Sequence, residues 1–164
     1  MTTTKPLKIL FLHGLEGTPN GSKPTHLSEA GHLVVAPALG KDDFNESLKI
    51  AESCAKEHNP DIIVGSSRGG ALAAAMDRNG AKVILIAPAW TKFDSPTCLD
   101  DDAIILHSTR DDIVSVKDSE ELAYKYGCTL IYCGENHRMR DEEAFAFLDG
   151  AVDTLSEKIA DGVK

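Results

Sequence analysis

Six short apolar runs, separated by segments with helical periodicity, constrain the fold of this chain more than any other feature. The runs occupy residues 8–13, 33–36, 62–65, 83–86, 104–107 and 130–133. Each run is almost continuously apolar, which is typical of strands that are covered on both faces. The alternation therefore predicts an α/β fold, with a doubly wound, mainly parallel six-stranded sheet and helices on both of its faces.

Helical patterns occupy four of the segments between or after these runs. Apolar residues recur at helical spacing over residues 42–58 and 141–159, which predicts two amphipathic helices. Residues 71–76 are apolar all round, as in a helix packed centrally against a sheet, and residues 119–126 stop before Gly127, a typical C-terminal cap. No internal repeat or linker divides the chain, so we expect a single domain over residues 1–164.

Charge and cysteine content narrow the range of partners. The formal net charge of −9 disfavours nucleic acid and anionic membrane surfaces. The first apolar run is too short for a secretion signal or a spanning helix, so we expect a cytoplasmic protein, either a monomer or a small homo-oligomer. The four scattered cysteines are expected to be reduced, and no cysteine or histidine spacing predicts a metal site or another cofactor.

Residues that directly follow the apolar runs are the candidates for chemistry, because ligands of doubly wound sheets bind outside the carboxyl ends of the strands. The segment Gly65-Ser66-Ser67-Arg68-Gly69 lies between a predicted strand and an apolar helix. In that context a Gly-x-Ser-x-Gly pattern forms a tight turn that exposes the serine hydroxyl. Ser67 is therefore the predicted nucleophile, and the alternative role for a serine at this place is a helix N-cap.

Two further side chains complete a predicted catalytic triad. Asp111 follows the fifth run and His137 follows the sixth, in the order nucleophile, acid, histidine that this architecture uses. His137 would accept the Ser67 proton while Asp111 holds the ring in the required tautomer. Asp112 lies in the same turn, but Asp111 is favoured because Val114 then lies three residues on, where an apolar residue packs under the acid. The alternatives are a solvated loop histidine and a turn aspartate.

Backbone amides are the predicted stabilisers of the charge that develops on the substrate carbonyl oxygen. The donors are expected to be the N–H of Arg68 and that of Leu15, in the loop after the first run. Gly14 and Gly17 would let this loop approach the substrate, unless they only turn the chain. Further substrate contacts are assigned to residues near these loops: His13, Gly14, Glu16, Trp90, Arg110 and Arg138, with Trp90 and Phe93 as an apolar wall.

Four motifs resemble those of the α/β-hydrolases: Phe11-Leu12-His13-Gly14-Leu15, Gly65-Ser66-Ser67-Arg68-Gly69-Gly70, Arg110-Asp111-Asp112-Ile113-Val114 and Glu135-Asn136-His137. Within that superfamily the chain is most similar to the small single-domain esterases of the YqiA type, which lack a large cap. The resemblance implies a lidless hydrolase of short or soluble acyl esters with a Ser67, Asp111 and His137 triad. Two residues depart from the pattern: Arg68 replaces a neutral residue and Ser108 replaces a glycine.

Arginines are concentrated around the predicted triad of this acidic chain. Arg68, Arg110 and Arg138 each adjoin a triad member, and Arg140 follows closely. One interpretation is that they recognise an anionic group of the substrate, since a guanidinium suits carboxylate and phosphate. The other is that they neutralise local acids, through pairs of Arg68 with Glu16 and of Arg110 and Arg138 with Asp112 and Glu135.

The leading functional hypothesis is serine-dependent hydrolysis of a small or soluble carboxylic ester through an acyl-enzyme. The short segment 89–103 leaves no room for a helical cap, which favours a shallow site and small substrates. A thioesterase or a short-peptide or amide hydrolase would use the same triad. A non-catalytic binding module with the same fold is the alternative from another class, because fold does not imply function.

Overall fold

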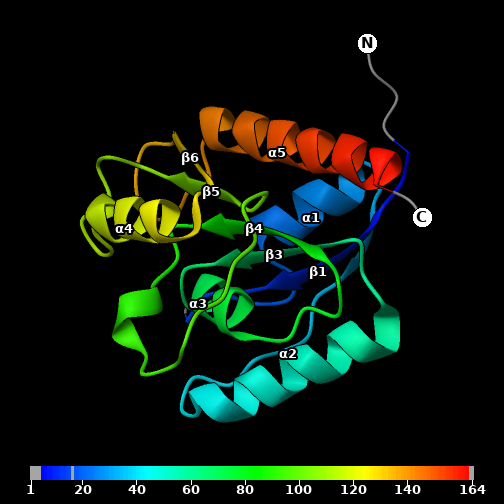
Figure 1. The fold of residues 1–164 in the computed structure, drawn as a ribbon, viewed down its shortest axis with the longest axis horizontal. Helices are drawn as coiled ribbons and strands as arrows, with labels where there is room; N and C mark the ends of the chain where they lie inside the picture. Colours follow the sequence, from blue (N-terminus) through cyan, green and yellow to red (C-terminus); the bar gives the residue numbers. More distant parts are fainter. Residues whose placement is uncertain (1–4, 16, 163–164) are drawn as a thin grey trace.

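All six predicted strands form, and they lie in one parallel sheet (Figure 1). The computed structural model describes residues 5–15 and 17–162. Its strands are β1 (Lys8–Leu12), β2 (Leu33–Val35), β3 (Ile62–Ser66), β4 (Lys82–Ile86), β5 (Ile104–His107) and β6 (Thr129–Tyr132). Their order across the sheet is β2-β1-β3-β4-β5-β6, and each neighbouring pair is parallel. The predicted doubly wound sheet is confirmed.

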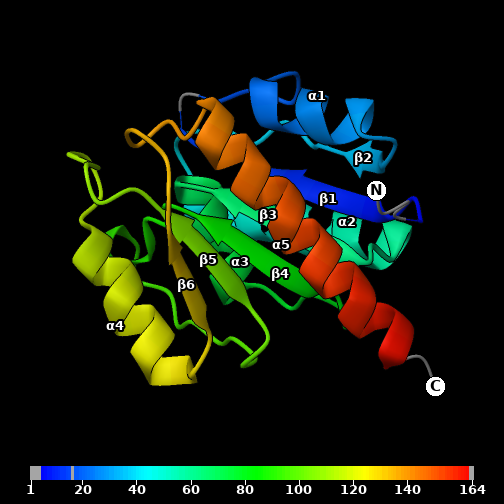
Figure 2. The same ribbon diagram turned by 90° about the horizontal axis from the view of Figure 1, so that it is seen from above.

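Helices cover both faces of this sheet (Figures 1 and 2). One face carries α1 (Ser22–Glu29) and α5 (Glu142–Asp161). The other carries α2 (Phe44–His58), α3 (Arg68–Ala75) and α4 (Val116–Tyr126). The connection from β4 to β5 contains only a 3₁₀ turn, Trp90–Lys92, so residues 87–103 form no helical cap over the sheet.

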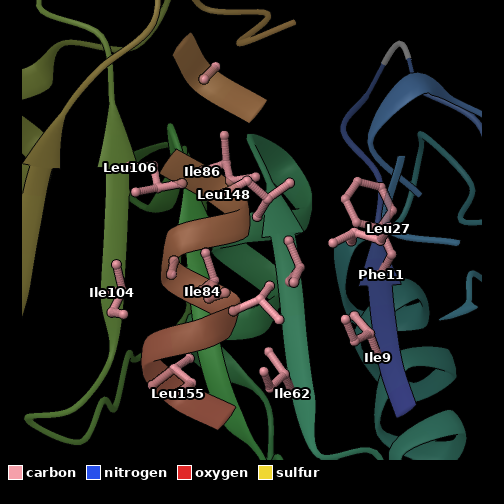
Figure 3. Close-up of a cluster of buried hydrophobic side chains, with 14 of the residues drawn as sticks. Ile9, Phe11, Leu27, Ile62, Ile84, Ile86, Ile104, Leu106, Leu148 and Leu155 are labelled. Atoms are coloured by element: carbon pink, nitrogen blue, oxygen red, sulfur yellow. The ribbon is translucent and has the colours of Figure 1, made fainter. Parts of the chain in front are cut away.

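Alternate residues of the central strands supply two hydrophobic cores. Ile84 and Ile86 of β4 point toward α5 and share a core with its Leu148 and Leu155 (Figure 3). Leu85, between them, belongs to the second core against α2, α3 and α4. Full burial of an aliphatic side chain of this size contributes about 1.5–3 kcal/mol. Both faces of the central strands are therefore apolar, which explains their continuous apolar runs.

The edge strands and α1 differ from the sequence expectation. Leu33 in β2 is 66% exposed and Tyr132 in β6 is 51% exposed, because helices do not fully cover the two edges of the sheet. The apolar pattern does not predict α1, since Leu27 is the only large aliphatic residue in that helix. Leu27 is nevertheless fully buried, and Pro24 lies in the first turn, where proline removes no helical hydrogen bond.

Polar caps define the ends of several helices. The Asp43 side chain accepts a hydrogen bond from the Glu46 N–H at 3.0 Å, so α2 begins after Asp43 rather than at residue 42. Gly127 ends α4 with φ of 67°, a left-handed conformation that glycine adopts readily, as predicted.

Cys54, Cys98, Cys128 and Cys133 form no disulfide in the structure. Cys128 directly precedes β6 and Cys133 directly follows it, so neither cysteine lies within the strand. Among residues 5–15 and 17–162, no group of three or more His, Cys, Asp or Glu side chains is arranged to hold a metal ion. None of the helices described is both long and apolar enough to cross a membrane.

The strand order determines where a ligand can bind. After β1 the chain passes through α1 to β2 at the edge, whereas after β3 it passes through α3 on the opposite face of the sheet. The connections from these two adjacent strands therefore diverge, and a crevice opens at their carboxyl ends. The predicted nucleophile turn and the predicted oxyanion loop both lie at this crevice.

Candidate active site

Ser67 lies in a strained turn between β3 and α3. Its backbone has φ of 58° and ψ of −114°, a conformation that costs a residue with a side chain about 1–3 kcal/mol. Hydrogen bonds hold it there: the Ser67 N–H donates to Ile86 O at 2.8 Å, and the Ala89 N–H donates to Ser67 O at 3.0 Å. A Cβ on Gly69 would overlap the Leu12 carbonyl group, so the turn requires glycine at that position.

The Ser67 hydroxyl does not cap α3. Its Oγ lies 3.0 Å from Nε2 of His137, in the loop after β6. The structure therefore places this side chain toward the histidine, and the geometry does not favour the alternative role of helix N-cap.

The ring of His137 connects Ser67 to a buried carboxylate. His137 Nδ1 lies 2.7 Å from Oδ2 of Asp111, in the loop after β5. Because a carboxylate only accepts hydrogen bonds, Nδ1 carries the proton, and Nε2 is left to accept the Ser67 hydroxyl proton. The Asp111 side chain is fully buried and that of His137 is 14% exposed, so the base is accessible at one edge only.

Asp111 accepts four hydrogen bonds, one of them from His137, which favours it over the neighbouring Asp112 as the acid. Its Oδ1 accepts from the backbone N–H groups of Ile113 and Val114, both at 2.8 Å. Burial alone would raise the pKa of Asp111, but the hydrogen bonds from Val114, His137 and Ile113 outweigh it and lower that pKa below its usual value. Asp111 therefore stays ionised beside the histidine, whereas Asp112 is exposed.

His107, the last residue of β5, also holds the Asp111 carboxylate. Its Nε2 lies 3.0 Å from both Asp111 Oδ2 and Val114 O. Both are acceptors here, so Nε2 carries a proton, and the Ser119 hydroxyl donates to Nδ1 at 2.7 Å in the neutral ring. The side chain is completely buried. His107 is a positioning residue that orients the acid rather than a group that meets substrate.

His107→Leu is expected to lower kcat for the predicted ester hydrolysis by about ten- to hundred-fold, because a displaced Asp111 carboxylate would no longer align the His137 ring. KM should change little, since His107 does not line the pocket. His107→Gln keeps a buried N–H donor near Asp111 and should restore most of the rate. Steady-state kinetics of both variants, with circular dichroism to verify folding, checks this expectation. Equal rates for His107→Leu and wild type would contradict it.

The predicted oxyanion donors lie beside Ser67. The first helical hydrogen bond of α3 runs from the Ala71 N–H to Ser67 O, so the Arg68 N–H has no acceptor within the helix. A Cβ on Gly14 would lie 3.3 Å from the Ser67 Cβ, which shows how closely the loop after β1 approaches Ser67. Leu15 follows in that loop, and both Leu15 and Arg68 line the same pocket as Ser67.

His13 shapes this loop and is not placed to bind substrate through its ring nitrogens. Nε2 accepts a hydrogen bond from the Leu39 N–H at 3.0 Å, so Nδ1 carries the proton and donates to Gly14 O at 2.7 Å. The side chain is buried. Both polar atoms of the ring are thus used to hold the backbone beside Ser67; His13 also lines the pocket, and its expected substrate contact stays a prediction.

A pocket of about 470 Å³ opens at Ser67 and His137, within the size range of small-molecule sites. Its apolar lining includes Phe11, Pro24, Ala89, Phe93, Ile113 and Val114. Trp90 lies outside this lining: its Nε1 donates to Asp118 O at 2.9 Å, and its ring packs against the second core. Of the predicted aromatic wall, only Phe93 faces the pocket.

The arginines near the triad are placed differently from one another. Arg138 and Arg140 line the pocket, whereas Arg110 is exposed and lies outside its lining. Among the described ion pairs, none joins Arg110 or Arg138 to Asp112 or Glu135. The expected contacts of Glu16, with substrate or with Arg68, lie outside the described residues.

The Arg68 side chain stabilises the pocket wall from behind. It is only 4% exposed, and both terminal nitrogens lie 3.3 Å from Ser47 Oγ of α2. Its guanidinium carbon lies 5.7 and 5.8 Å from the ring centroids of Phe44 and Phe93, which stack on each other. The guanidinium is therefore packed between elements and is not presented to a ligand.

Comparison with known proteins shows the same architecture in hydrolases. No family model and no curated protein matches the sequence. Among solved structures, mouse alpha/beta hydrolase domain-containing protein 10 superposes with a TM-score of 0.77 at 18% identity, covering 96% of this chain and 92% of that one. The chain has the α/β-hydrolase fold.

Two bacterial structures with this fold are also similar. Est1E from Butyrivibrio proteoclasticus, solved with ferulic acid, has a TM-score of 0.75 at 18% identity, with 96% and 90% of the two chains covered. The esterase domain of a Rhodothermus marinus protein has a TM-score of 0.66 at 17% identity, with 93% and 86% covered. The resemblance seen in the sequence is thus confirmed for the fold, and the YqiA-type assignment stays a prediction.

Three side chains that shape the site in this α/β-hydrolase fold were not predicted from sequence. His107 had a weak signal, since it ends a strand four residues before the acid. Lys23 and Ser47 had none, because they come from helices that reach the site only through packing. Ser108, which replaces the usual glycine, is completely buried, and its hydroxyl donates to Gly134 O at 2.9 Å.

Proposed function

We propose that this protein is a serine hydrolase that cleaves small or soluble carboxylic esters through an acyl-enzyme. The observation that carries the proposal is the chain of hydrogen bonds from Ser67 through His137 to Asp111 at the edge of an open pocket. A binding module with this fold would not need a serine held in a strained conformation with its hydroxyl directed at a histidine.

The proposed reaction has two half-steps with the same proton carrier. Ser67 Oγ attacks the ester carbonyl carbon as His137 Nε2 takes its proton, and that proton then leaves with the alcohol. Water next attacks the acyl-enzyme and gives a proton to His137, which returns it to Ser67 as the carboxylic acid departs. The ionised Asp111 stabilises the imidazolium in both half-steps, and the N–H groups of Arg68 and Leu15 are the candidate oxyanion donors.

The pocket supports small ester substrates. Its volume of about 470 Å³ and its mostly apolar side chains suit a short acyl or aryl group. The 3₁₀ turn between β4 and β5 leaves the site without a helical lid in that segment, so a long acyl chain would remain in water. Two proteins of similar structure also point to esters: Est1E, solved with ferulic acid, and an esterase domain.

A fluorophosphonate probe is expected to label the folded protein at Ser67, because only an activated serine reacts rapidly with the phosphorus centre. Peptide mass spectrometry locates the adduct. Ser66→Ala should keep the label, whereas Ser67→Ala should lose it and His137→Ala should slow it strongly. A panel of 4-nitrophenyl esters should show higher kcat/KM for acetate and butyrate than for decanoate. A folded protein that takes no label would favour the binding module.

A further inference from the structure

The described lining of the pocket beside Ser67 and His137 is positively charged, opposite in sign to the chain as a whole. The chain contains 26 acidic and 17 basic residues. The described part of the pocket lining nevertheless includes no Asp or Glu, and its charged side chains are Lys23, Arg68, Lys92, Arg138 and Arg140. Charges of one sign in a concave site concentrate their field and attract ligands of the opposite sign.

Lys23, Arg138 and Arg140, named here the cation cluster, lie beside the catalytic base. Lys23 Nζ donates to the carbonyl oxygen of Arg138 at 2.6 Å, which joins α1 to the loop that carries His137. The carbonyl occupies one of the three ammonium donors, and the other two have no acceptor among the described residues. Lys23 is 8% exposed, whereas Arg138 and Arg140 are exposed.

Ion pairs between described residues do not neutralise the cation cluster. Burial and then the charges of Arg140 and Arg138 lower the pKa of Lys23 to about 8. Asp141 acts in the opposite sense, but its carboxylate accepts hydrogen bonds from the backbone N–H groups of Glu135 and Ala144. No ion pair within residues 5–15 and 17–162 includes a member of the cluster.

The other two cations of the pocket lie apart from this group in their contacts. The Arg68 guanidinium packs against Phe44 and Phe93 and contacts Ser47. Lys92 Nζ donates to Ile113 O at 3.2 Å, in the loop that carries Asp111. Lys92 is thus a single cation with donors to spare, whereas the cation cluster combines an ammonium and two guanidinium groups close enough to act on one another.

We propose that the cation cluster is an anion subsite, and that the natural substrates are esters that carry a carboxylate or phosphate group in addition to the scissile bond. This inference rests on the proposed ester hydrolysis and specifies its substrate class. A bound anion would offset the repulsion among the three cations and satisfy the free donors of Lys23. The anion takes no part in bond making, and its binding holds the carbonyl carbon near Ser67.

Two matched ester pairs test the subsite. In the first pair, mono-4-nitrophenyl succinate, which carries its charge in the acyl part, is compared with neutral 4-nitrophenyl butyrate. In the second pair, 4-acetoxybenzoate, which carries its charge in the alcohol part, is compared with its neutral methyl ester. At pH 7 at least one anionic ester should exceed its neutral partner in kcat/KM by about ten-fold. The preference for the anionic ester should be lost in Lys23→Met and in a double variant that combines Arg138→Gln with Arg140→Gln. Misfolding is a minor concern for the double variant, because Arg138 and Arg140 are exposed.

Arg110→Gln is the matched control, because it removes a positive charge next to Asp111 but outside the pocket lining. It should keep the preference for the anionic ester. Benzoate and phenyl phosphate, used as competitive inhibitors of 4-nitrophenyl butyrate turnover, then distinguish carboxylate from phosphate. Calorimetric titration of Ser67→Ala with the same two anions measures the subsite without turnover.

The pH dependence supplies a second readout. As pH rises through about 8, Lys23 loses its charge, so the ratio of anionic to neutral kcat/KM should fall, and it should stay flat in Lys23→Met. The charged groups around Lys23 are Arg138, Arg140 and Asp141, with His26, paired to Asp149, one turn along α1. The arginines keep their charge over this range.

The outcomes separate the two proposals. If Ser67-dependent turnover is present but both anionic esters are hydrolysed no faster than their neutral partners, the subsite is overturned and ester hydrolysis stands. If no ester is turned over, but benzoate or phenyl phosphate binds to the wild type and not to Lys23→Met, the proposal of ester hydrolysis is overturned and the anion subsite stands. An unchanged preference in both cluster variants also overturns the subsite.

Discussion

Ser67→Ala is expected to lower kcat for ester hydrolysis by roughly 10⁴- to 10⁶-fold, because no acyl-enzyme can form without its hydroxyl. KM should change by less than about three-fold, since the pocket walls are untouched. The fold should also be preserved: alanine keeps the Cβ in the same backbone conformation, and the only hydrogen bond described for the Ser67 hydroxyl is the one to His137.

Kinetics of purified Ser67→Ala with 4-nitrophenyl butyrate, beside Ser66→Ala, measures this effect. Ser66 ends β3 one residue earlier, so its variant reports any loss caused by disturbing the turn rather than the nucleophile. The thermal midpoint of each variant verifies that it is folded. Turnover of Ser67→Ala above about one-hundredth of the wild-type rate would mean that another group carries the reaction.

Asp111→Asn is expected to lower kcat by roughly 10⁴-fold through the tautomer of His137. Backbone N–H groups of Ile113 and Val114 point at Oδ1, so the asparagine must place its oxygen there. Its NH₂ group then faces His137 Nδ1, which becomes an acceptor, and the ring proton moves to Nε2. A protonated Nε2 cannot take the proton of Ser67.

Asp112→Asn is the matched control for this substitution, because it makes the same chemical change one residue away at an exposed position. It should keep kcat within about two-fold of wild type. The NMR chemical shifts of the His137 ring nitrogens should report the change of tautomer in Asp111→Asn. Equal losses in the two variants would contradict the assignment of Asp111 as the acid.

The sheet was predictable because its signal is local. A strand covered on both faces must be apolar along its middle, and β1, β3, β4 and β5 satisfy this requirement, with their polar residues confined to the strand ends. Their boundaries agree with the apolar runs to within one residue. The edge strands and α1 carry weaker patterns, since half-covered elements need few apolar residues, and α1 was missed for this reason.

The meeting of the three predicted triad side chains was predictable because topology brings strand ends together. In a parallel sheet the residues after β3, β5 and β6 all emerge at one edge, so Ser67, Asp111 and His137 were expected to be neighbours from their order alone. The distances of 3.0 and 2.7 Å that join them agree with this expectation. Sequence order says nothing, however, of which way the neighbouring side chains point.

The amino-acid sequence alone thus determined the layers of the fold, because they follow from hydrophobic periodicity. It also determined the strand ends at which the site lies, because the turn after β3 requires its glycines. Only the tertiary structure decided what surrounds the triad. Packing buried Arg68 between aromatic rings, left Arg110 outside the pocket, and brought Lys23 of α1 to Arg138. Such contacts join residues far apart in sequence, and their geometry depends on how helices dock, which no local pattern encodes.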